Sequence, residues 1–234
     1  MEKRDKIYEG KAKILYTTDN PDLLIQYFKD DATAFNAAKK GTILDKGIIN
    51  NKISTKIFES LIAAGIPTHF EKSLSDREML VKKVQIVPLE VIIRNVAAGS
   101  MSRILGIEEG RKLACPVLEF CYKEDKLNDP LINDTHVLAL QLATQEEIDT
   151  IKKYTYQIND LMLKFFGALN INLIDFKLEF GKYKGKVILA DEISPDTCRL
   201  WDSKTGEKLD KDRFRRDLGN IEQAYQEVLS RVSR

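Results

Sequence analysis

Residues 173–180, LIDFKLEF, decide how we interpret the fold. Side chains along a β-strand point alternately to its two faces, so Asp175, Lys177 and Glu179 share one face. Phe176, Leu178 and Phe180 share the other. After the glycine-flanked turn GKYKG, residues 186–191 form a second, mainly apolar strand. The pattern predicts a β-hairpin with one apolar face and one ionisable face.

The second strand of this hairpin ends in Asp191 and Glu192, which bring further carboxylates toward the first strand. Closely spaced carboxylates repel one another unless a cation lies among them. Mg²⁺ accepts one or two such oxygens and completes its shell with water and phosphate. Glu179 and Asp191 are therefore candidate magnesium ligands, and the alternative is a strand face that is simply solvated.

Upstream of the hairpin, hydrophobic patterns predict several strands and one helix. The predicted strands span residues 7–17, 23–28, 79–87 and 89–96, and Pro88 separates the last two. Apolar residues at helical spacing predict a helix over residues 45–64. We expect a first lobe over residues 1–84 and a second lobe over residues 85–234.

The second half of the chain predicts two more helices and one long loop. Thr144 and Glu147 form a capping box that opens a helix running to about Gly167. Asp210 caps a final helix with one apolar side. Residues 115–140 include a polar, turn-rich segment that we interpret as a long loop, and such loops are commonly functional.

Two further motifs favour phosphate binding. Arg94 leaves a predicted strand and Ser100 enters a predicted helix, so the turn between them offers N–H groups, a hydroxyl and a guanidinium to an anion. Arg199 adds a second guanidinium if its loop folds back. Lys11 and Lys13 point to one side of a strand, which favours a polyanion, although neither a P-loop nor a dinucleotide-binding glycine motif is present. The structural alternatives are a capped helix with a surface arginine and lysines that protect an edge strand.

Composition excludes several classes of protein. The 234 residues carry a net charge of +1, so the overall basic excess of a nucleic-acid-binding protein is missing. Three cysteines without a C-x-x-C pair argue against disulfides and zinc, and we expect reduced thiols in a cytoplasmic protein. We expect neither a signal peptide nor a membrane span. His69 and His136 lie in no catalytic motif, so we interpret both as ordinary polar residues.

Four motifs in order, YEGKAKILY, PLEVIIRNVAAGS, LIDFKLEFG and ADEISPDTCRLWD, resemble the SAICAR synthetase (phosphoribosylaminoimidazole-succinocarboxamide synthase) family of purine biosynthesis. The resemblance spans nearly the whole chain. It implies a two-lobed α+β fold, with an antiparallel nucleotide-binding N-lobe related in shape to kinases and ATP-grasp enzymes and a larger mixed α/β C-lobe. It also implies an ATP-dependent, magnesium-using ligase that joins L-aspartate to the ribonucleotide CAIR, giving SAICAR, ADP and phosphate. The expected form is a cytoplasmic homodimer with no nucleic-acid or membrane partner.

The resemblance also implies roles for individual residues. The residues that it implies for ATP binding are Lys11, Lys13, Lys82 and Val84, and those that it implies for Mg²⁺ binding are Glu179 and Asp191. The residues that it implies for binding the 5′-phosphate of CAIR are Arg94, Ser100 and Arg199. Its imidazole and ribose would be lined by Glu90, Asp175 and Lys177. We expect Asp175 and Lys177 to be catalytic, with Asp175 as the base toward the aspartate amine. Asn36 stands where some members carry aspartate, which leaves the role of an acid there open.

A carboxylate is a poor acyl donor to an amine, so we expect ATP to convert the CAIR carboxylate first to an acyl phosphate. Magnesium and lysine would stabilise the transferring phosphoryl group. We expect residues 123–136 to form a lid that excludes water. Two other functions use the same residues: a small-molecule kinase, and a nucleotide-sensing protein without catalysis. A strict requirement for aspartate in turnover separates the ligase from both.

Overall fold

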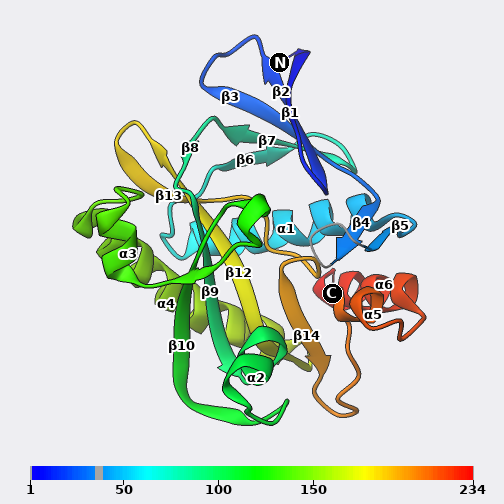
Figure 1. Ribbon diagram of the computed structural model, residues 1–234. Helices are drawn as coiled ribbons and strands as arrows, with labels where there is room; N and C mark the ends of the chain where they lie inside the picture. The colour runs from blue at the N-terminus through cyan, green and yellow to red at the C-terminus, as the bar shows by residue number, and fades with distance from the viewer. Residues whose placement is uncertain (1, 35–38, 234) are drawn as a thin grey trace.

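The computed structural model describes residues 2–34 and 39–233 (Figure 1). The strands are β1 (Lys3–Glu9), β2 (Lys13–Thr18), β3 (Leu23–Phe28), β4 (Asp31–Ala34), β5 (Lys39–Thr42), β6 (Phe70–Ser73), β7 (Glu78–Lys82), β8 (Gln85–Ile86), β9 (Leu89–Val96), β10 (Lys112–Tyr122), β11 (Leu131–Ile132), β12 (Ile171–Tyr183), β13 (Lys186–Ala190) and β14 (Cys198–Asp202). The helices are α1 (Lys46–Ala63), α2 (Gly99–Leu105), α3 (Asp134–Ala139), α4 (Gln145–Ala168), α5 (Asp212–Arg215) and α6 (Ile221–Val232), with a 3₁₀ turn η1 (Asp125–Leu127). This mixture confirms the predicted α+β class.

Two antiparallel sheets form the framework. The first has the order β1-β2-β3-β7-β6 and lies at the top of Figure 1. The second has the order β11-β10-β9-β12-β13, and β8 and β14 also pair with β12. Helix α1 packs against β3, β6 and β7 of the first sheet and against α6, whereas α4 packs against β9 and β12 of the second.

The predicted hairpin is the centre of the second sheet. Its first strand, β12, is longer than predicted and bonds with β9 and β14 along its first part and with β8 and β13 along its second. Glu179 lies opposite Ala190 across the hairpin, so Asp191 follows directly after a residue paired with Glu179. The pairing confirms the hairpin and brings these two acids to one end of it.

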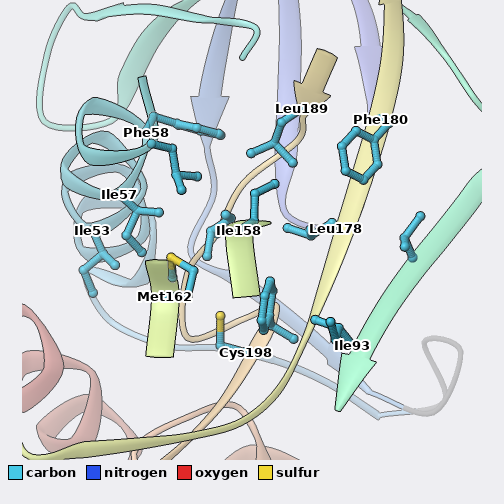
Figure 2. Packing of buried hydrophobic residues seen from close by; sticks show 14 of the residues in the cluster. Ile53, Ile57, Phe58, Ile93, Ile158, Met162, Leu178, Phe180, Leu189 and Cys198 are labelled. Carbon is cyan, nitrogen blue, oxygen red and sulfur yellow. The ribbon is translucent and has the colours of Figure 1, made fainter. Parts of the chain in front are cut away.

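Buried apolar side chains from both sheets and both long helices form one continuous cluster. Figure 2 shows Ile53, Ile57 and Phe58 of α1 facing Leu189, with Ile158 of α4 beside them. Each of these side chains is at most 1% exposed. Because the cluster runs from the α1 side to β12, the packing holds the elements that carry the predicted site residues in fixed positions.

Some predicted elements are confirmed and others are wrong. The capping box is present, because the Thr144 hydroxyl accepts from the Glu147 N–H at 3.2 Å and the Glu147 carboxylate accepts from the Thr144 N–H at 2.9 Å. The polar segment at residues 123–136 is not one continuous loop, since it holds η1, β11 and the start of α3, and the apolar patch before it belongs to β10. The single strand over residues 79–87 is likewise two strands, β7 and β8.

The final helix is also not continuous from Asp210. Helix α5 ends at Arg215, and α6 begins only at Ile221. Between them Asp217, Gly219 and Asn220 have positive φ angles of 54°, 71° and 50°, a conformation that ends a right-handed helix. Glycine and asparagine accept this conformation readily, so the break is visible in the sequence in retrospect.

Helix α1 begins without the usual capping interaction. Asp45, at its N-cap, has a φ of 60° and makes no side-chain capping bond. The carboxylate of Asp30 accepts from the Gly47 N–H at 2.9 Å instead, and it also accepts two hydrogen bonds from Arg77 at 2.7 and 2.9 Å. Asp30 therefore supplies the cap from outside the helix and ties it to the first sheet.

Replacing Asp30 by asparagine should lower the free energy of unfolding at pH 7 by about 1–2 kcal/mol, the usual cost of losing a cap. Burial raises the pKa of Asp30, but the hydrogen bonds from Arg77 and Gly47 outweigh burial and lower it overall. A lowered pKa in the folded state means that this stabilisation is complete above the ordinary carboxyl pKa of about 4 and is lost as the pH falls further. Urea unfolding of wild type and Asp30→Asn at pH 7 and pH 3 measures the difference. An equal difference at both pH values would contradict this account, and Asp76→Asn, in an exposed pair with Lys52, is the control.

No described helix is both long and apolar enough to cross a membrane. Cys115, Cys121 and Cys198 are all free thiols, as predicted. Burial raises the pKa of the Cys121 thiol to about 11, so this side chain stays uncharged at neutral pH.

Candidate active site

A cleft of about 1530 Å³ is lined by residues from both sheets. Among the residues that the sequence assigned to a site, those that line it are Lys11, Lys13, Lys82, Val84, Glu90, Arg94, Ser100, Lys177, Glu179, Asp191 and Arg199. Lys11 lies in the bend before β2 rather than in a strand, yet it still reaches the cleft with Lys13. Segments far apart in sequence therefore converge on one cavity.

Acids and lysines alternate along the hairpin side of the cleft. The Glu179 carboxylate, 5% exposed, accepts from Lys177 at 2.7 Å and from Lys123 at 2.6 Å. Lys177 also donates to Glu90 at 2.8 Å. Asp191, with a left-handed φ of 63°, pairs with Lys13 from the first sheet. This pair connects the GKAK motif directly to the end of the hairpin.

The charges in this cluster hold one another ionised. Burial raises the pKa of Asp191, but the nearby Lys13 and Lys177 outweigh it and lower the pKa well below the usual range. Burial lowers the pKa values of the two lysines, and Asp191 and Glu179 outweigh it and raise them. The cleft therefore presents anionic oxygens and ammonium groups together at neutral pH.

The chemistry of these donors fits a magnesium ion. Glu179 and Asp191 both line the cleft and both present carboxylate oxygens, the ligands that Mg²⁺ takes from proteins. Among the described residues, no group of three or more His, Cys, Asp or Glu side chains converges as a complete metal cage. A site at which the protein supplies only two carboxylate ligands suits an ion that takes its other ligands from phosphate and water.

The predicted phosphate-binding residues also meet. Arg94 donates to the Ser100 hydroxyl at 2.9 Å, and Ser100 lies in the first turn of α2. Gly99 before it has a φ of 58°, and a Cβ at this position would collide with the guanidinium of Arg199. Glycine here is what allows Arg199 to lie against the start of α2. Two guanidiniums and a hydroxyl thus face the cleft, the groups that bind a phosphate monoester.

Asp175 lies behind this pair of arginines and not among the residues that line the cleft. It is 3% exposed, and its carboxylate accepts from Arg94 at 2.8 Å and from Arg199 at 2.9 and 3.0 Å. Both arginines sit directly opposite it, on β9 and β14. The geometry makes Asp175 the shared anchor of the two guanidiniums.

Several cleft residues were not predicted. Lys123 lies in the segment that we interpreted as a loop, and Asp125 in η1 pairs with Lys11 at 2.7 Å. Asp196 accepts from the fully buried Lys46 at 2.8 Å and from the Tyr225 hydroxyl at 2.7 Å. No local pattern marks such contacts, because they join residues far apart in sequence. Asn36 lies outside the described residues.

Comparisons with known proteins identify the family of the chain. A family model described as SAICAR synthetase matches residues 6–232. The phosphoribosylaminoimidazole-succinocarboxamide synthase of Lachnoclostridium phytofermentans is 64% identical over 232 residues, 99% of each chain. That of Clostridium acetobutylicum is 60% identical over 233 residues, covering 100% of this chain and 99% of the relative.

Solved structures give the same result. The phosphoribosylaminoimidazole-succinocarboxamide synthase from Ehrlichia chaffeensis superposes with a TM-score of 0.96 at 48% identity and covers 98% of each chain. A SAICAR synthetase in complex with ADP superposes with a TM-score of 0.93 at 45% identity and covers 96% of each chain. The protein belongs to the SAICAR synthetase family.

Proposed function

We propose that the cleft joins L-aspartate to the carboxylate of CAIR in an ATP-dependent reaction that gives SAICAR, ADP and phosphate. The observation that carries this proposal is the joint placement of two charged sites in one cavity. The Lys13–Asp191 and Lys177–Glu179 pairs suit a nucleoside triphosphate, and the Arg94–Ser100–Arg199 group suits the phosphate of a ribonucleotide. A ligase that uses ATP to activate the carboxylate of a ribonucleotide must bind both substrates side by side in one cavity.

ATP would lie with its base beside β7 and the residues that follow it. Lys82 and Val84 line that end of the cleft together with the apolar side chains of Leu24, Val81 and Ile86, which suit the faces of a purine. Lys11 and Lys13 would point toward the phosphates. Asp191 and Asp125 hold these two ammonium groups in place before the nucleotide arrives.

Glu179 and Asp191 would hold Mg²⁺, which neutralises charge on the triphosphate during phosphoryl transfer. The chain's own cations support the same step. Lys13 lies 3.2 Å from Glu192 as well as beside Asp191, so its ammonium is held from two sides. Lys177 is held by Glu90 and Glu179. Preorganised positive charge of this kind stabilises the transition state without moving during the reaction.

For CAIR, Arg94, Ser100 and Arg199 would bind the 5′-phosphate, and Glu90 and Lys177 would face the imidazole and ribose. The CAIR carboxylate would then attack the γ-phosphorus and release ADP. The aspartate amine would attack the resulting acyl phosphate and expel phosphate, which takes up the proton that the amine loses. Asp175, the predicted base, is already bound by two guanidiniums. We therefore assign it the positioning of Arg94 and Arg199.

Two further parts of the proposal concern organisation. The first sheet ends at Lys82 and the second begins at Gln85, which supports lobes over residues 1–84 and 85–234. The family resemblance supports a homodimer in the cytoplasm. Residues 123–136 would close over the substrates, and the ion pair of Asp125 with Lys11 supports this part of the proposal, because it joins the segment to a lysine proposed to face the triphosphate.

The proposal is tested by following ADP and SAICAR in parallel with purified protein, ATP, Mg²⁺ and CAIR, with and without L-aspartate. We expect equal amounts of ADP and SAICAR, and only when aspartate is present. ADP release that ignores aspartate, with no SAICAR, would instead indicate a kinase or an uncoupled ATPase.

A further inference from the structure

His69 is held rigidly at the base end of the cleft. Its backbone N–H donates to the Leu189 carbonyl at 2.8 Å, and its carbonyl accepts from the Lys82 N–H at 2.7 Å. The imidazole packs edge-on against Phe58 with ring centroids 5.4 Å apart. It is 4% exposed, yet it lines the cleft together with Lys82 and Val84. The ring therefore has one fixed orientation toward the place proposed for the base.

One nitrogen of this ring lacks a partner. Nε2 of His69 is buried and makes no hydrogen bond. Within residues 2–34 and 39–233, the other buried side-chain atoms without a partner belong to Asn50, Asn51, Thr55, Ser102 and Trp201, and none of these residues lines the cleft. A buried polar atom without a partner is costly and rare, and one at a binding cleft indicates a partner supplied by the ligand.

The state of the ring defines what that partner must be. The ring is buried and forms a hydrogen bond with the Asp191 backbone that favours its protonated form. Because a buried cation without a paired carboxylate is costly, the imidazole is neutral. A backbone group that favours the protonated ring is a carbonyl that accepts from a ring N–H. Since Nε2 is the nitrogen without a partner, the proton lies on Nδ1 and Nε2 presents a lone pair. The ligand must donate a hydrogen bond to it.

We propose that Nε2 of His69 accepts a hydrogen bond from the 6-amino group of adenine and thereby selects ATP over GTP. This inference rests on the proposed function, because it takes the nucleotide base to lie beside Lys82 and Val84. Adenine carries a donor at position 6, whereas guanine carries a carbonyl oxygen there. That oxygen would face the Nε2 lone pair and leave both acceptors without a proton. His69, which the sequence marked only as an ordinary polar residue, becomes the specificity-determining residue for the base.

The test compares ATP, GTP and purine riboside triphosphate, which lacks the 6-amino group, as substrates for SAICAR formation. Wild type should prefer ATP over purine riboside triphosphate by roughly 10-fold or more in kcat/KM, and GTP should be poorer still. His69→Leu should raise KM for ATP by a similar factor, leave kcat nearly unchanged, and treat ATP and purine riboside triphosphate alike. His69→Gln, whose Oε1 also accepts a hydrogen bond, should restore the preference.

Gln157→Leu is the control, because Gln157 is exposed on α4 and does not line the cleft, so the nucleotide preference should not change. A His69→Leu variant that keeps the wild-type ratio of ATP to purine riboside triphosphate would overturn the inference. Calorimetric binding to wild type gives a second, mutation-free measurement, and equal affinity for these two nucleotides would overturn it as well. If wild type makes no SAICAR, the proposed function fails, while the binding measurement still decides the role of His69.

Discussion

Glu179→Gln should lower kcat for SAICAR formation by about 10²- to 10³-fold, the usual effect of removing one preorganised charge-stabilising group. The carboxylate lies at 2.7 Å from Lys177 and 2.6 Å from Lys123, at the point where the triphosphate and its metal would sit. The amide keeps the size of the side chain but loses the negative charge. Mg²⁺ would then lose a ligand, and Lys177 would lose one of the two acids that hold it.

The variant should remain folded, which keeps the result interpretable. Lys177 retains Glu90 at 2.8 Å, and the side chain of Lys123 is 38% exposed, so water can solvate it when its partner is neutral. We would measure single-turnover rates over a range of Mg²⁺ concentrations, with thermal unfolding as the check on folding. Glu227→Gln removes an exposed carboxylate on α6 and should behave as wild type. A Glu179→Gln enzyme with normal kcat and normal magnesium dependence would exclude Glu179 from the metal site.

The parts of the fold that the sequence predicted depend on local patterns. The hairpin of β12 and β13 follows from period-2 alternation and a glycine-flanked turn, and the start of α4 follows from a capping box four residues long. Strand β10 was missed because its side chains are mostly half-buried or exposed and its partner, β9, lies earlier in the chain. Such a strand carries no clear alternation, and only its pairing makes it a strand.

The site residues likewise fall into two groups: those that local motifs predict and those that only contacts between distant segments bring together. Motifs quoted from the sequence supplied most of the cleft residues, because each motif keeps its charged residues within a few positions of a glycine or a strand end. The buried pair of Lys46 and Asp196 joins residues 150 positions apart, and no spacing rule finds it. Asp175 shows a subtler limit. Alternation placed it on the ionisable face with Lys177, but the register with β9 and β14 decides that two arginines cover it.

Asp175→Asn should lower the free energy of unfolding by about 3–5 kcal/mol, because it leaves two buried guanidiniums without their shared anion. Arg94 is 2% exposed, and the side chain of Arg199 is 17% exposed, so water solvates neither fully. Each keeps one other acid, Glu119 for Arg94 and Asp212 for Arg199, which should leave a folded protein at low temperature. Urea unfolding measures the loss, and an unchanged midpoint would contradict the role of Asp175 as an anchor.

Kinetics of the same variant separate anchoring from proton transfer. If Asp175 positions the phosphate-binding arginines, Asp175→Asn should raise KM for CAIR at least 10-fold and leave the shape of the pH–rate profile unchanged, since the expelled phosphate, and not Asp175, takes the amine proton. If Asp175 is the base, kcat should fall with KM for CAIR unchanged, and the acidic limb of the profile should disappear. Glu119→Gln removes a different anion from Arg94 and should raise KM for CAIR less, because Asp175 still holds both guanidiniums at 2.8–3.0 Å. A graded rise in KM across the two variants, with one pH profile throughout, is a result that only the anchoring role produces.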